Sequence, residues 1–183
     1  MSRLPKIRVE TFAAIAATIV STAALFVAWD QARIARTEVK AAIWPAMQIN
    51  GFTETGDGIA VGVRARNAGV GPALVERVHV TYDGVPVATR QELAAHWPGP
   101  FMMSYDTLAG RVVAPGESFD FLRLQYPETG APADLAEIVA AESLKWKVEA
   151  CYCSTLNECW ISNTDVGRPQ ETDSCDGVPE GDF

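Results

Sequence analysis

The sequence has few of the residues on which common catalytic sites depend. Its 183 residues include only two histidines, His79 and His96. No H-E-x-x-H zinc motif occurs, no Ser-His-Asp order follows a nucleophile elbow, and no pair of carboxylates has a spacing that indicates acid–base catalysis. We therefore expect a protein that is not an enzyme and that needs no cofactor.

Basic residues are also scarce. The chain has 15 Lys and Arg against 23 Asp and Glu, a formal net charge of -8. Nucleic-acid binding depends on a basic patch that displaces the counterions of the phosphates, so a nucleic-acid partner is excluded. The acidic residues are scattered except for a modest cluster near the C-terminus, which we interpret as a solvated tail (Glu171, Asp173, Asp176, Glu180, Asp182).

The longest feature that the sequence does have is an uncharged apolar run over residues 11–29. About twenty apolar residues are enough for a helix to cross a bilayer core of roughly 30 Å. We expect residues 1–10 to be a cytoplasmic N-terminus, 11–29 a transmembrane helix and 30–45 a helical stalk that stops before Trp44-Pro45. The alternative is a cleavable secretion signal. Against it, the run exceeds a signal core of about 7–15 residues, and Phe26 stands where cleavage needs a small residue.

Small residues recur on one side of this predicted helix. Ala17, Ser21 and Ala24 are spaced by four and three residues, which places them on one face. In lipid, small residues let helix backbones approach closely, so this face is a candidate contact with an integral membrane protein complex. The alternative interpretation is a general bias of the chain toward alanine.

The four cysteines all lie in the last third of the chain, without C-x-x-C spacing and without a neighbouring histidine. This even number favours disulfides formed in an oxidising compartment. Cys153 and Cys159 flank a span that a hairpin can bridge, which leaves Cys151 to pair with Cys175. The alternative is a thiolate site for copper(I) or zinc, in a metal-handling or redox protein.

The cysteines also decide the orientation, because positive charges flank the apolar run on both sides. With disulfides, the C-terminal domain lies outside the cytoplasm. For a bacterial chain, that means a single pass through the inner membrane and a domain in the periplasm.

The rest of the chain alternates apolar and polar residues as short strands do. The patterns predict strands over residues 47–53, 58–66, 73–82, 85–90, 112–113, 118–126, 144–153 and 160–164, with a helix over 132–143. Asp83-Gly84 is a strong hairpin turn. We expect a mainly β domain, an antiparallel β-sandwich with one inserted helix over residues 46–165, and a tail over 166–183 that a disulfide attaches to it.

Three pieces of sequence support a family resemblance. They are Asn67-Ala-Gly69-Val-Gly71-Pro72-Ala73 between two strands, the hairpin at 82–87, and Val113-Ala-Pro-Gly-Glu-Ser118 before another strand. Their order resembles immunoglobulin-like modules of the CARDB type, and more closely the uncharacterised single-pass bacterial envelope proteins with an N-x-G-x-G-P-A motif. The resemblance covers about residues 46–165 and implies an immunoglobulin-like fold, but it says little of function.

The N-x-G-x-G-P-A segment also has a direct physical interpretation as a structural turn. Gly69 and Gly71 can adopt φ values that other residues avoid, Pro72 fixes the entry to the next strand, and Asn67 can bond nearby backbone groups. A phosphate-binding loop would need a following lysine and the start of a helix, and the segment has neither.

One loop has apolar residues that the strand pattern leaves without a place in the core. Trp97, Phe101, Met102 and Met103 can form a tip that binds a partner or the membrane surface, or the loop can fold over the edge of the domain. Taken together, these features predict a membrane-anchored accessory or assembly subunit that acts by protein–protein interaction. The alternatives are the metal-handling or redox protein and a ligand-binding sensor or adhesion module.

Overall fold

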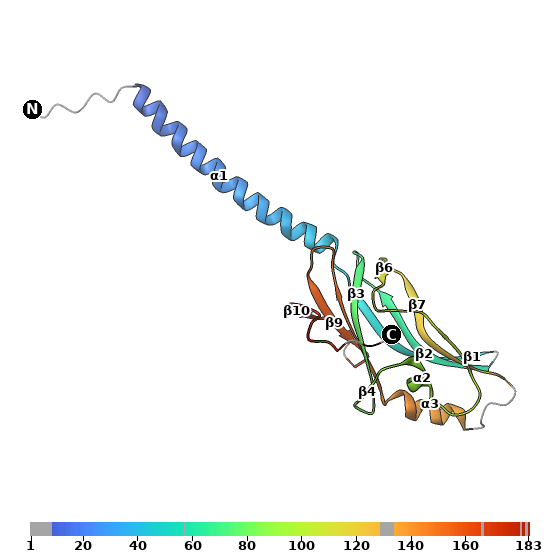
Figure 1. Ribbon diagram of the computed structural model, residues 1–183. Coiled ribbons are helices and arrows are strands. Elements are labelled where there is room, and N and C mark those ends of the chain that lie inside the picture. Colours follow the sequence, from blue (N-terminus) through green and yellow to red (C-terminus); the bar gives the residue numbers. More distant parts are fainter. Residues whose placement is uncertain (1–8, 57, 129–133, 166, 180, 182) are drawn as a thin grey trace, which may run out of the picture. The chain divides into compact units, whose positions relative to one another are not determined.

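The computed structural model describes residues 9–56, 58–128, 134–165, 167–179, 181 and 183 (Figure 1). The chain divides into two compact units, Met1–Ala41 and Ala42–Phe183.

The first unit is a helix, α1, which continues from Val9 to Ala42. Its 34 residues include no glycine or proline, and Pro45 follows its end, as expected if proline disfavours the helical conformation in the residue before it. The predicted membrane helix and most of the predicted stalk are thus one element. All of its side chains are exposed, and it is long and apolar enough to cross a membrane.

The second unit is mainly β. One sheet has the order β1-β2-β7-β5, and its neighbouring strands are antiparallel. The bounds are β1 Met47–Gly56, β2 Gly58–Asn67, β7 Ser118–Tyr126 and β5 Met102–Tyr105. The sequence analysis placed β5 within an irregular loop, so this edge strand is a correction.

The other sheet has the order β10-β9-β8-β3-β4, and β6 also pairs with β3. The bounds are β10 Gln170–Thr172, β9 Cys159–Asn163, β8 Trp146–Cys153, β3 Ala73–Tyr82, β4 Val85–Val87 and β6 Val112–Val113. The expected hairpin joins β3 to β4: Asp83 and Gly84 have φ of 50° and 79°, the positive values that a tight hairpin turn requires.

Both sheets contribute to a single core. Val63 and Leu122 of the first sheet belong to the same buried cluster as Val78 and Val148 of the second. A bulge between Val75 and Arg77 shifts the alternation of buried and exposed residues in β3 by one position. Because of this shift, Val75 and Val78 are both buried although they are three residues apart. The sheets therefore face each other across one apolar layer.

Two helices accompany the sheets in the described part of the second unit, where the sequence predicted one. Helix α3, Leu135–Ser143, is the expected one. Helix α2, Arg90–Ala94, was missed, although it begins with a recognisable cap: the Thr89 hydroxyl accepts a hydrogen bond from the Glu92 amide. Both helices lie near the same end of the unit (Figure 1).

Candidate functional site

The face predicted for helix association lies on the exposed surface of α1. Ala17, Ser21 and Ala24 are all exposed. Two nearby hydroxyls are already satisfied within the helix: Thr18 donates to the Ala14 carbonyl at 2.9 Å and Thr22 to the Thr18 carbonyl at 2.8 Å. These bonds leave few polar groups that would need water, which makes the helix compatible with an apolar environment.

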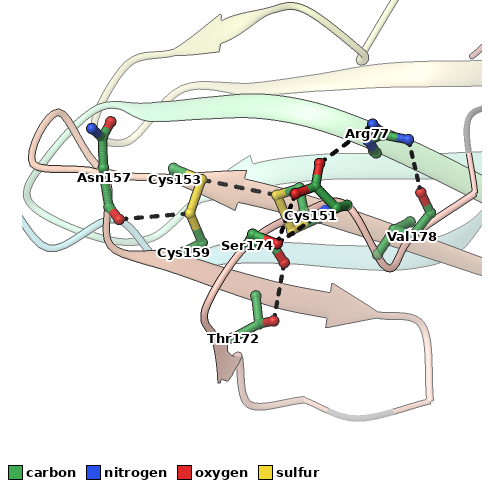
Figure 2. The surroundings of a disulfide bond; sticks show 10 residues. Arg77, Cys151, Cys153, Asn157, Cys159, Thr172, Ser174 and Val178 are labelled. Carbon is green, nitrogen blue, oxygen red and sulfur yellow. Dashed lines mark hydrogen bonds and ion pairs between the residues drawn. A yellow bond between two sulfur atoms is a disulfide. The ribbon is translucent and has the colours of Figure 1, made fainter.

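The cysteines form two adjacent disulfides, with the pairing that the spacing predicts. Cys151 is bonded to Cys175 and Cys153 to Cys159, and no cysteine of the chain is free. The Sγ atoms of Cys153 and Cys175 are 3.9 Å apart, so the two bonds touch (Figure 2). A soft-metal site at this position would need thiolates, which the disulfides do not provide.

The segment predicted as a solvated tail is attached to the second unit by more than a disulfide. Its strand β10 pairs with β9, and its apolar residues Val178 and Phe183 are buried. Arg77 donates to the Val178 carbonyl at 3.3 Å (Figure 2). Arg77 also pairs with Asp176 at 3.7 Å. The acidic side chains of Glu171, Asp173 and Asp176 are exposed as expected, but the segment itself is part of the fold. Glu180 and Asp182 lie outside the described residues.

Asn67 is the last residue of β2, and its side chain bonds the loop that leads to β3. Its side chain is fully buried, and its amide nitrogen donates to the carbonyls of Gly71 at 2.8 Å and Val113 at 3.0 Å. Its amide oxygen accepts from the backbone nitrogens of Ala46 at 3.2 Å and Gly69 at 3.0 Å. One side chain thus joins three segments that are distant in sequence.

The two glycines of this loop act differently from the prediction. Neither Gly69 nor Gly71 has a positive φ, so unusual backbone angles do not explain them. They are needed for close approach: a Cβ at Gly71 would overlap the carbonyl of Ile43, and one at Gly69 the backbone of Ala46. Pro72 is half-buried and precedes β3, as predicted. The loop holds the chain segment over residues 43–46 against the domain.

Of the two interpretations of the loop that contains Trp97, the structure agrees with the one in which the loop folds over the edge of the domain. Trp97 is only 6% exposed and packs edge-to-face on Trp146, with ring centroids 4.7 Å apart. Phe101 contacts Tyr126, and Met103 is partly buried against the core. Of the four predicted residues, only Met102 is exposed. The loop folds over the edge of the domain because its aromatic side chains complete the core.

The sequence analysis missed a charged network on the outer face of the first sheet. Arg64 binds Asp120 at 2.6 Å and Glu54 at 2.9 Å, and Arg123 binds the same two carboxylates. Hydrogen bonds from Arg64 and Arg123 lower the pKa of Glu54. Burial opposes ionisation of Asp120, but the bonds from the same arginines outweigh it and lower its pKa as well. The alternating arginines of β2 were the available signal.

A second polar cluster was also missed. It lies where β3, α3 and the segment after α2 meet. Tyr82 donates to Glu142, Lys145 bonds to Glu142 at 2.7 Å, and the His96 ring is stacked 3.8 Å from the Tyr82 ring. The hydrogen bond to Glu142 raises the pKa of Tyr82, so its hydroxyl stays protonated near neutral pH. A protonated phenol of this kind holds structure together but is a poor base.

Comparisons of the chain with protein-family models, curated proteins and solved structures find no match.

Proposed function

We propose that this chain is a single-pass membrane protein whose immunoglobulin-like domain lies outside the cytoplasm and acts by binding. In this proposal it is a non-enzymatic accessory or assembly subunit of a membrane protein complex. For a bacterial chain, the membrane is the inner membrane and the domain is periplasmic.

The observation that carries the proposal is helix α1. It combines length, apolar composition, complete exposure of its side chains and hydroxyls that are satisfied internally. Such a helix needs an apolar environment, because exposing its side chains to water is unfavourable. Lipid supplies that environment, and a small-residue face within it favours contact with another helix.

The strand order supports an immunoglobulin-like domain. The sheets β1-β2-β7-β5 and β9-β8-β3-β4 correspond to the strand sets ABED and GFCC′ of that fold. The chain departs from antibody domains in its disulfides, which join β8 to β9 and to the segment after β10 instead of joining the two sheets. A fold of this type hosts many unrelated functions, so the binding role is supported by helix α1 and not by the fold.

The two buried disulfides support a location outside the cytoplasm. Cytosolic thiols are kept reduced, whereas disulfides form and persist in the periplasm and in secreted proteins. All four cysteines are at least nine-tenths buried, so the bonds are structural in character.

The test is purification of the full chain from its native membrane in a mild detergent, followed by mass spectrometry of the proteins that remain bound. We expect a stoichiometric membrane complex. Replacement of Ala17, Ser21 and Ala24 by leucine should reduce recovery of the partner several-fold, because larger side chains hold helix backbones apart.

The matched control changes the opposite side of the same helix to leucine, at Ile15, Ile19 and Phe26. These residues are already large, so recovery of the partner should be unchanged. The proposal is refuted if the native chain is recovered alone. If both triple variants retain the partner equally, the face formed by Ala17, Ser21 and Ala24 is not the contact surface.

A further inference from the structure

Strand β1 is the longest strand at a sheet edge in the described part of the chain. It has ten residues, whereas the other edge strands, β5, β4 and β10, have four, three and three. An edge strand presents backbone N–H and C=O groups with which another chain can pair, and short edge strands are one way in which proteins limit such pairing. β1 does not have this protection.

The hydrogen bonds at the start of β1 show which of its backbone groups point away from β2. The Met47 amide donates to the Tyr152 hydroxyl at 3.1 Å, and the Met47 carbonyl accepts from the Ser162 hydroxyl at 2.7 Å. In an antiparallel pair the direction of the backbone groups alternates along the strand, and the register between β1 and β2 is unbroken. Gly51 and Thr53 therefore direct their N–H and C=O groups away from β2, as Met47 does.

These outward groups of Gly51 and Thr53 are available for pairing. Both residues are exposed, and no other described residue forms a hydrogen bond with their outward backbone groups. The result is two donors and two acceptors, with the spacing of a β-strand. The backbone of an added strand matches this arrangement, which is the basis of peptide binding at sheet edges.

The same stretch of β1 also lies beside a cavity of about 310 Å³ between the two sheets. The inward-facing side chains of Met47 and Ile49 are buried, but the next two inward positions, Gly51 and Thr53, are exposed. Leu144 lines this cavity and is 83% exposed. A cavity of about 150 Å³ can hold a benzene molecule, so there is room here for side chains of an added strand.

A second hollow, of about 150 Å³, continues along the first half of β1. It lies between residues 47–50 and the segment that follows β9, where Thr164 and Gly167 line it. Thr164 lines the larger cavity as well. The open space thus follows β1 over more than half of its length, which fits an extended segment better than a compact ligand.

We propose that β1 binds an extended segment of another protein, which joins the sheet as an additional strand. Its backbone pairs with Gly51 and Thr53, and apolar side chains at alternate positions enter the cavity and cover Leu144. A second copy of this chain fits less well. Paired through its own β1, it would bring Gly51 and Thr53 to this space, and these residues have too little apolar surface to cover Leu144. The surface is separate from the small-residue face of α1, so either binding can fail without the other.

The test uses the full chain in lipid nanodiscs, with a short peptide of alternating valine and threonine that has a lysine at each end as the probe. The readout is hydrogen exchange of the β1 amides, followed in ¹H–¹⁵N spectra. Without the peptide, the amides of Gly51 and Thr53 should exchange quickly, and those of Asn50 and Phe52, which face β2, slowly. Saturating peptide should slow exchange at Gly51 and Thr53 by about tenfold or more.

Two modified peptides test whether the backbone carries the binding. One is N-methylated at every valine and the other at every threonine, so each has lost the N–H donors of one edge. Only one edge of the peptide can pair with β1, because neighbouring residues of a strand direct their N–H groups to opposite sides. We expect one of the two to bind as the parent peptide does and the other to lose binding.

Gly51→Pro tests the site on the protein. Proline is tolerated in an edge strand where the N–H that it removes does not face the neighbouring strand, so the pairing with β2 should remain. Binding should weaken by about tenfold or more. Gly51→Ala is the matched control, because it keeps the N–H. A Cβ there has the Gly62 carbonyl oxygen 3.8 Å away as its nearest neighbour, so it fits. Gly51→Ala should bind the peptide as the native chain does.

Four results would overturn the inference. They are unchanged exchange at Gly51 and Thr53 with saturating peptide, equal binding by the two N-methylated peptides, and native binding by a folded Gly51→Pro. The fourth is protection of Gly51 and Thr53 without peptide that is lost on dilution, which would show that a second copy occupies the edge. If Gly51→Pro does not fold, the N-methylated peptides still decide the question.

Discussion

Replacement of Asn67 by alanine tests how the domain holds the segment that precedes β1. The substitution removes all four hydrogen bonds of the buried amide, two donated to carbonyls and two accepted from backbone nitrogens. Alanine is small enough to fit, so no overlap is introduced. The loss therefore reports on the hydrogen bonds, together with the small cavity that the missing amide leaves.

The magnitude follows from the number of bonds. A hydrogen bond contributes about 0.5–1.5 kcal/mol net, so four give about 2–6 kcal/mol, and partial rehydration of the freed groups favours the middle of this range. We expect a loss of about 4 kcal/mol. A domain of this size has about 5–15 kcal/mol in total, so Asn67→Ala should leave a folded but much weakened protein.

Equilibrium unfolding in urea, followed by near-ultraviolet circular dichroism of the full chain in detergent micelles, measures this change. Asn50→Ala is the matched control, because Asn50 is an exposed asparagine on β1 and its loss should change stability by less than about 0.5 kcal/mol. A loss below about 1 kcal/mol for Asn67→Ala would refute the reasoning. It would mean that water or a shifted backbone replaces the four bonds.

Two further predictions concern the disulfides and acid. Titration of the unfolded, unreduced protein should find no free thiol. Replacing Cys151 and Cys175 by alanine should lower the free energy of unfolding by about 3.5 kcal/mol, and replacing Cys153 and Cys159 should lower it by about 2.4 kcal/mol. The first pair contributes more because it closes the longer loop, with a sequence separation of 24 against 6. A larger loss for the second pair would contradict this reasoning. Several carboxyl pKa values are lowered by hydrogen bonds in the folded state, so their stabilisation is present above an unfolded pKa of about 4 and is lost as the pH falls through the folded value. The groups with a lowered pKa are Glu54, Glu117, Asp120 and Glu142. The urea midpoint should therefore be constant from about pH 7 to 5.5 and fall below about pH 4.5. The fall should be less steep in Asp120→Asn, and equal slopes would show that the Asp120 carboxylate does not contribute to the acid sensitivity.

Most strands could be predicted from local pattern alone. Alternation in β7 and the turn at Asp83-Gly84 depend only on neighbours in sequence, and both were predicted correctly. Strands β5 and β10 were missed because they are short edge strands whose partners lie far away in the chain. Helix α2 was missed although Thr89 and Glu92 have the spacing of a capped helix start, because five residues are too few to show a helical period.

The candidate sites divide in the same way. The pairing of the cysteines follows from their spacing, so the sequence was sufficient for it. The two glycines of the Asn67 loop were correctly assigned to a structural turn but for the wrong reason. Glycine is required at these two positions because the backbone of Ile43 and Ala46, more than twenty residues away in sequence, leaves no space for a Cβ. The sequence left two interpretations of Trp97 open for the same reason: its partner Trp146 is distant in the chain.

The glycines of the β domain differ in the space around them, and the sequence does not show which are needed for close approach. Glycine within a strand is less favourable than alanine by about 0.5–1 kcal/mol, and Gly51 has room for a side chain. Gly69 and Gly71 also lack side chains, but there a Cβ would collide with backbone. Gly62 is similarly enclosed by the carbonyl of Leu122. Gly51 and Gly56 therefore have no steric reason to be glycine, and the sequence alone cannot distinguish them from Gly62, Gly69 and Gly71, whose neighbours are brought close only by the fold.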